Sequence, residues 1–122
     1  MRIVLFILLI TAFFGCSGDK EPKYDPTQKS LKRGKLLYHQ CIVCHGDRAQ
    51  NSYMEVVPPI RELEFGARSQ MMEAYRNSSV GKGLYGLADL KGEVMLRLSD
   101  EDMRDIDIYI EFMKEQDEKN SN

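Results

Sequence analysis

The stretch CIVCH, residues 41–45, places three reactive side chains within five positions. Cys41 and Cys44 are two residues apart, and His45 follows directly. This spacing occurs in structural zinc sites, in redox-active dithiols and in the attachment sites of c-type haem. Each of these uses needs different surroundings, so the rest of the chain must decide among them.

A zinc site and a dithiol both lack support elsewhere in the sequence. Structural zinc takes four ligands, and besides the two cysteines of CIVCH the chain offers only His39 and His45. A thioredoxin-like dithiol needs a strand before the motif and a helix after it, within an α/β pattern. No stretch of this chain alternates apolar and polar residues with period two, so we expect no sheet. Both uses remain as alternatives.

Haem attachment fits the same spacing without further ligands. Two cysteines separated by two residues can add to the two vinyl groups on one side of a porphyrin, and the histidine that follows can lie under the iron. We therefore expect one covalent haem c, held through Cys41 and Cys44, with His45 as the proximal iron ligand.

The N-terminus has the pattern of an export signal. Arg2 precedes an apolar run that ends at Gly15 and Cys16. The run is short for a membrane span and suits a signal peptide. We expect residues 1–16 to be a lipoprotein-type signal with lipid on Cys16; an ordinary signal peptide and an uncleaved anchor are the alternatives. All three place the rest of the chain outside the cytoplasm. Residues 17–25 have the composition of a flexible linker.

Apolar periodicity predicts three helices, in residues 24–41, 67–77 and 98–116. Asp25 is the expected cap of the first helix and Ser99 that of the last. Gly34 lies on the apolar face of the first helix, where it could let another helix approach closely. The fold class is therefore all-α. The net charge of −2 provides no basic stripe for nucleic acid.

In their order along the chain, three motifs resemble class I c-type cytochromes of the small bacterial mono-haem kind. GKLLY stands before CIVCHG, PPI follows, and LSDEDMRDIDIYI comes last. The resemblance covers residues 26–115, leaving 116–122 as a charged tail. It implies a cytochrome c-like fold whose N-terminal and C-terminal helices cross, with Tyr109 against Gly34 and Tyr38. It also implies that the loop at Pro59 accepts a hydrogen bond from His45.

The resemblance further implies a methionine on the far side of the iron. Met95 precedes the last helix and is the expected sixth ligand, although the family's ligand usually lies further upstream, where Leu90 and Lys91 stand. The alternatives are another methionine, Lys91, or an open site; the methionines concerned are Met54, Met71 and Met72.

The implied function is electron transfer by a membrane-tethered protein of the periplasm, not catalysis. Its partners would be a quinol-oxidising complex, a terminal oxidase or a periplasmic oxidoreductase, met by a monomer. The alternative is a haem-based sensor or a haem subunit of a larger complex. A local docking patch is expected from the basic residues near the motif: Lys32, Arg33, Lys35 and Arg48. GKGLYG, residues 81–86, matches a dinucleotide-binding pattern but lacks the βαβ context and is expected to be a loop at one haem edge.

Overall fold

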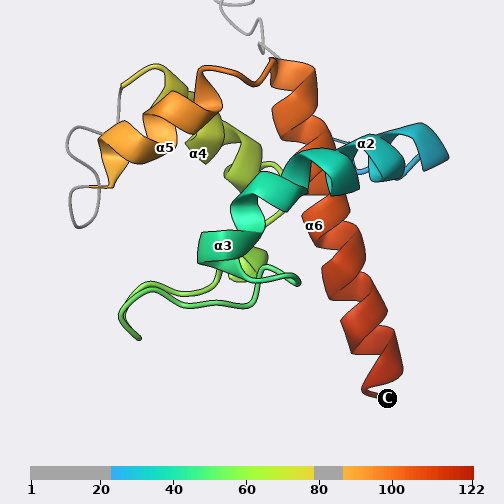
Figure 1. Cartoon of the computed structure of the whole chain (residues 1–122). Helices are drawn as coiled ribbons and strands as arrows, with labels where there is room; N and C mark the ends of the chain where they lie inside the picture. Colours follow the sequence, from blue (N-terminus) through green and yellow to red (C-terminus); the bar gives the residue numbers. More distant parts are fainter. Residues whose placement is uncertain (1–22, 79–86) are drawn as a thin grey trace, which may run out of the picture.

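The computed structural model describes residues 23–78 and 87–122, and these residues form a helical protein (Figure 1). The described residues contain no β-strand, only an isolated bridge between Tyr53 and Val57. The all-α prediction is therefore confirmed. The elements in chain order are α2 (Gln28–Tyr38), the 3₁₀ turn η2 (His39–Cys41), α3 (Ile42–His45), the 3₁₀ turn η3 (Ile60–Glu62), α4 (Ala67–Arg76), α5 (Ala88–Met95) and α6 (Asp100–Asn120).

Several sequence predictions fall outside these residues, namely the signal segment, the first part of the linker and the GKGLYG loop. Among the helices in the two described ranges, none combines the length and apolar character needed to cross a membrane.

Helix α6 starts where the sequence predicts. Ser99 is its N-cap: the Ser99 hydroxyl accepts the Asp102 N–H at 3.1 Å, and the Ser99 N–H donates to the Asp102 carboxylate at 2.9 Å. This reciprocal pair is a capping box, and the acidic first turn complements the helix dipole. The helix continues to Asn120, beyond the domain end expected at residue 115.

The cap predicted for the first helix is wrong by two residues. Thr27, not Asp25, is the N-cap of α2, and its hydroxyl accepts the Ser30 N–H at 3.1 Å. The Asp25 carbonyl instead accepts the Thr27 N–H at 3.0 Å, so Pro26 lies in a turn before the helix. Thr27 is three residues before Ser30, which is the separation that an N-cap oxygen requires.

Helix α2 crosses α6 at Gly34 (Figure 1). A Cβ atom on Gly34 would lie 2.1 Å from the Asp105 carbonyl oxygen and 2.8 Å from the Tyr109 Cβ. One turn later, the Tyr38 and Tyr109 rings lie 5.8 Å apart between centroids. The expected contact of Tyr109 with Gly34 and Tyr38 is confirmed, and the two helices touch backbone to backbone.

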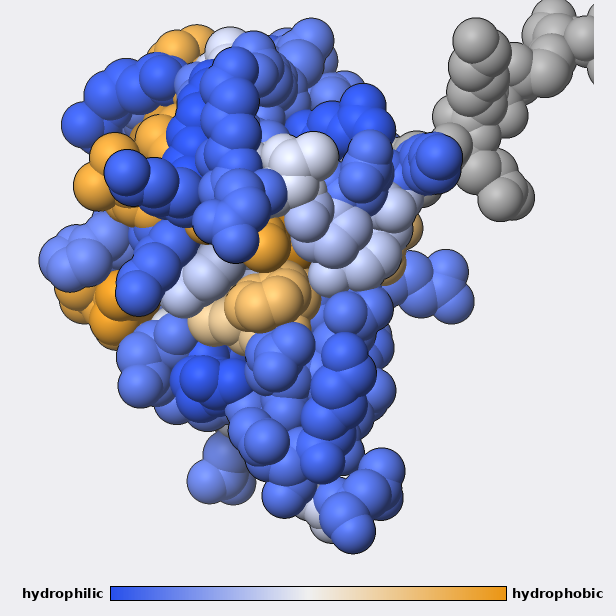
Figure 2. Space-filling model, turned by 90° about the vertical axis from the view of Figure 1, so that its right-hand side faces the viewer, coloured by the Kyte–Doolittle hydropathy of each residue, from blue (hydrophilic) through white to orange (hydrophobic). Residues whose placement is uncertain are grey.

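Ion pairs extend the α2–α6 contact. The Arg33 guanidinium lies 2.6 Å from Glu101, 2.5 Å from Asp102 and 3.3 Å from Asp105, all at the start of α6. Arg33 of the expected docking patch therefore pairs with carboxylates of α6. Figure 2 views the molecule from the right-hand side of Figure 1, where α2 and α6 lie, and this face is mainly hydrophilic.

Helix α4 is joined to α6 by a buried ion pair. The Arg68 side chain is 3% exposed and its Nε donates to Asp107 at 2.5 Å; a second donor of Arg68 pairs with Glu111. Asp107 also accepts the Gly66 N–H at 2.8 Å. A buried charge is tolerated when it is paired and its remaining hydrogen-bond positions are filled, as they are here.

The end of the predicted linker is attached to the domain. Tyr24 packs edge-on against Phe65, with ring centroids 5.3 Å apart, and its hydroxyl donates to Glu115 at 3.3 Å. The Lys23 carbonyl accepts a hydrogen bond from Arg104 at 3.2 Å. The chain before α2 therefore lies along α6.

The sequence does not predict α5. This helix packs on α4, and a Cβ on Gly92 would lie 3.3 Å from the Tyr75 carbonyl oxygen. Gly92 lowers helix propensity while allowing the two helices to approach.

Replacing Gly34 by Ala should lower the free energy of unfolding by about 1–3 kcal/mol, because overpacking a closed contact forces backbone shifts. The cost of overpacking must be larger than the roughly 1 kcal/mol by which alanine stabilises a helix relative to glycine. Gly92→Ala is the matched control, since its Cβ would lie 3.3 Å from the Tyr75 carbonyl oxygen, a tight contact that a shift of a few tenths of an ångström relieves, and it should change stability by less than about 1 kcal/mol. Urea denaturation measures both. Equal stability of the two variants would contradict the close contact.

Candidate functional site

Cys41, Cys44 and His45 lie on one face of a helical turn. The backbone from η2 into α3 has right-handed helical angles, with φ −90° and ψ −17° at Cys41 and φ −58° and ψ −39° at Ile42. Residues three and four apart on a helix are neighbours on its surface. The structure therefore places the three predicted attachment residues side by side, as a single group would require.

Gly46 ends this turn. Its φ of 82° lies in the left-handed region, and a Cβ there would lie 2.5 Å from the Gln50 Oε1. Glycine is the residue that adopts this conformation at no steric cost, and it commonly stops helices in this way. The chain thus turns back immediately after His45.

Two hydrogen bonds hold the backbone at His45 and directly after it. The Tyr38 hydroxyl, which is buried, donates to the Gly46 carbonyl at 2.6 Å. The Asn51 N–H donates to the His45 carbonyl at 3.0 Å. Burial raises the pKa of Tyr38, so its hydroxyl stays neutral and available as a donor. Sequence reasoning assigned Tyr38 to the helix contact and missed its bond to the Gly46 carbonyl.

The two thiols are free and differ in their surroundings. Cys41 is half-buried and packs against the hydrophobic core. Burial, with a smaller effect of the neighbouring Cys44, raises the pKa of Cys41 to about 11. Cys44 is exposed. In residues 23–78 and 87–122, no group of three or more His, Cys, Asp or Glu side chains is arranged to hold a metal ion.

His45 is half-buried, and its pKa is lowered by burial and by the positive charge of Lys91. The imidazole is therefore neutral at pH 7, which is the form that binds metals.

Helix α5 carries two of the candidate sixth ligands one turn apart, Lys91 and Met95. The Lys91 Nζ lies 4.8 Å from the centre of the Tyr75 ring and 3.4 Å from its hydroxyl. Met95 is half-buried and packs against the same core cluster as Cys41 and Ile60. The turn Cys41–His45 is named the attachment turn. The structure thus brings Met95 and the attachment turn onto one core.

The other candidate methionines lie in different environments. Met54 is 62% exposed and has a φ of 52° in the loop after the motif, and Met71 is 44% exposed on α4. Met72 is buried in the core. The Pro59 carbonyl accepts the Glu62 N–H at 3.0 Å, and a carbonyl has two lone pairs, so the bond from His45 stays a prediction.

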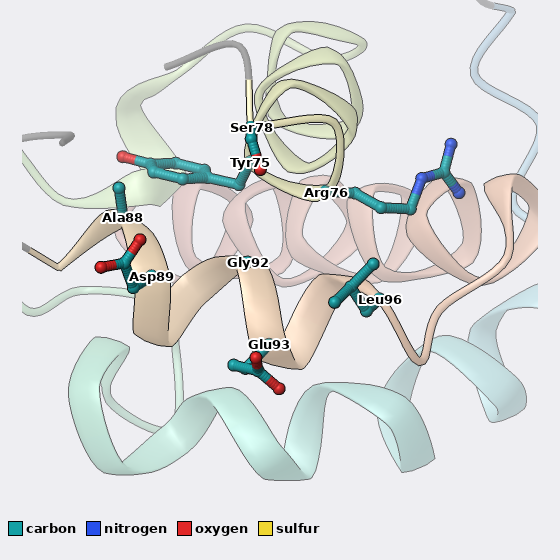
Figure 3. Close-up of a pocket in the computed structure, with 8 residues that line it drawn as sticks. All are labelled: Tyr75, Arg76, Ser78, Ala88, Asp89, Gly92, Glu93 and Leu96. Atoms are coloured by element: carbon teal, nitrogen blue, oxygen red, sulfur yellow. The ribbon is translucent and has the colours of Figure 1, made fainter. Parts of the chain in front are cut away.

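A pocket of about 250 Å³ lies between α4 and α5 (Figure 3). This volume is below the roughly 300–1,000 Å³ of ordinary ligand pockets. The pocket is separate from the attachment turn, since its lining includes none of Cys41, Cys44, His45 and Met95. It is lined by Tyr75, Arg76, Ser78, Ala88, Asp89, Gly92, Glu93 and Leu96.

Comparison with known proteins gives no match of any of three kinds: no family model, no curated protein and no solved structure is similar to this chain.

The two thiols should differ in reactivity when the haem-free, reduced chain is treated with iodoacetamide. The thiolate is the reacting form, so at pH 8 the exposed Cys44 should be alkylated well before Cys41, whose thiol has a raised pKa. Alkylation of Cys41 should increase as the pH approaches 11. Peptide mass spectrometry measures both rates. In urea the two rates should become similar; similar rates in the folded chain would contradict the burial of Cys41.

Proposed function

We propose that this protein is an electron carrier outside the cytoplasm, tethered to a membrane through lipid on Cys16 and carrying one haem c. The observation that supports it most is the single helical face shared by Cys41, Cys44 and His45. Each thiol would add across one vinyl group, sulfur to one carbon and hydrogen to the other, and His45 would bind the iron.

The surroundings of these residues fit that group. Both thiols are free, and His45 is in the neutral form that coordinates iron. Apolar side chains are exposed in the motif itself, in the loop that follows it and on α5, and they offer cover for a large apolar ring. They are Val43, Met54, Val56 and Leu90.

The helix crossing supports a cytochrome c-like fold. Residues 26–115 would form this domain, with Gly34 and Tyr109 at the contact of α2 with α6. The short helix α5 would then provide the residue that completes the haem site.

Met95 is the proposed sixth ligand. It packs on the same core as Cys41 and stands on α5. A thioether ligand raises the reduction potential relative to histidine. Lys91, one turn earlier on α5, is the second candidate because its charge acts on His45.

When bound, the haem would supply one-electron exchange between ferric and ferrous states, and Cys41, Cys44 and His45 would hold it. The proposed partners are a quinol-oxidising complex, a terminal oxidase or a periplasmic oxidoreductase, and such contacts are small and transient. Lys32 and Lys35 are exposed for docking, whereas Arg33 and Arg48 pair with α6.

Expression of the full chain in a host that attaches c-type haem tests the proposal. The purified protein should be red, keep its colour through acid–acetone extraction, and gain the mass of one haem. Cys41→Ala with Cys44→Ala should abolish all three, because both thioethers are lost. His39→Ala, two residues before the motif, is the control and should keep the haem. A colourless wild-type protein with a Cys41–Cys44 disulfide would refute the proposal.

Met95→Ala should remove the weak long-wavelength absorption band of a methionine–ferric iron bond and let the ferrous form bind CO. Met54→Ala is the comparison, because Met54 is an exposed alternative ligand, and the band should persist in this variant if Met95 binds the iron. Persistence of the band in Met95→Ala would exclude Met95 as the ligand.

A further inference from the structure

Asp117 lies near the end of α6, in the segment that the sequence predicts to be a charged tail. Its carboxylate meets two arginines. Arg48 Nε donates to Asp117 Oδ2 at 2.9 Å and Arg48 Nη2 donates to Oδ1, while Arg61 Nη1 lies 2.9 Å from Oδ2. These three residues are named the Asp117 cluster. Arg48 Nη2 also donates to the Met113 carbonyl at 3.2 Å, which fixes Arg48 on α6 a second time.

One arginine belongs to the loop that leaves His45, and the other belongs to η3. Arg48 is three residues after His45, in the loop that begins at Gly46. Arg61 is the middle residue of η3, the turn that begins directly after Pro59. The segments are also joined to each other, because the Arg61 N–H donates to the Ala49 carbonyl at 3.3 Å. Ala49 is fully buried, so this connection is part of the core. Asp117 thus fastens both segments to one helix.

The geometry of the cluster is stronger than that of an ordinary surface pair. Single exposed ion pairs contribute little, but a two-bond arginine–carboxylate contact and a shared network are the recognised exceptions. The hydrogen bond from Arg48, and then that from Arg61, lowers the pKa of Asp117, so its carboxylate is charged at neutral pH. Without that charge, two guanidinium groups would remain with less compensation.

We propose that Asp117 is a positioning residue for His45. It acts through Arg48 and Arg61, which hold the loop that leaves His45 and the turn that follows Pro59. The inference rests on the proposed function, since the orientation of His45 matters for electron transfer only if it binds the iron. A second consequence concerns charge. Asp117 compensates the positive charges of Arg48 and Arg61, and this would favour the more positive ferric state of a bound haem iron.

The test compares Asp117→Asn with Glu118→Gln in the full, haem-loaded chain. Both variants remove one negative charge from adjacent positions of α6, but Glu118 is exposed and lies outside the cluster. Asp117→Asn should raise the reduction potential more than Glu118→Gln does. It should also speed amide exchange at Asn51 and Arg61 about tenfold, the scale of losing a hydrogen bond to a charged group. Glu118→Gln should leave that exchange unchanged.

A second pair of variants tests the route through Arg48. Arg48→Gln should also speed amide exchange at Asn51, and its combination with Asp117→Asn should speed this exchange by less than the product of the two separate factors, because both variants break the same contact. Asp117→Glu restores the charge and should recover most of the wild-type potential. Equal potentials in Asp117→Asn and Glu118→Gln, with unchanged exchange, would overturn the positioning role alone. A wild-type chain without haem would overturn the proposed function, and the positioning role with it.

Discussion

The contact at Gly34 is the constraint on which the other parts of the structure depend. No side chain fits between α2 and α6 there, because the Asp105 carbonyl occupies the space that a Cβ would need. The crossing point is therefore fixed, and Tyr38 is fixed one turn later against Tyr109. The Tyr38 hydroxyl then holds the Gly46 carbonyl, at the end of the attachment turn. One glycine thus determines where Cys41–His45 stands relative to α6.

Helix α6 also serves as the common support for the other segments. Arginine–carboxylate contacts follow one another along it: Arg33 of α2 and Arg76 of α4 pair with its first turns, Arg68 joins α4 to its middle, and the Asp117 cluster joins the loops near its end. Only the Arg68 contact is deeply buried. An exposed ion pair adds little to the free energy of unfolding, whereas removing one partner of a buried pair lowers it strongly. The middle of α6, where Asp107 pairs with Arg68, is therefore the part of this helix most sensitive to substitution.

Local signals in the sequence predict the parts of the fold that local interactions determine. Caps and helical periodicity depend on near neighbours, and they predict the Ser99 cap and the place of Gly34 on an apolar face, whereas the contact of Tyr109 follows from the resemblance to c-type cytochromes. Asp117 was missed because its arginine partner Arg48 is 69 residues away, and helix α5 because Gly92 and a weak apolar pattern hide it. The same limit applies to the site. The CxxCH spacing is local and specific, whereas the proposal of Met95 as sixth ligand depends on how α5 packs.

Because Tyr24 contacts α6, the described part of the chain that lies on the domain begins within seven residues of Cys16. Seven peptide units separate Cys16 from Lys23, and at full extension they span roughly 25 Å. A domain of about 100 residues has a radius of gyration near 13 Å, so the greatest distance between Cys16 and Lys23 is close to twice that radius. With lipid on Cys16, the carrier would stay within one protein layer of the bilayer and search for partners by lateral diffusion in two dimensions. The distance between the domain and the bilayer, together with the reduction potential of the proposed haem, would then determine which proteins can exchange electrons with it.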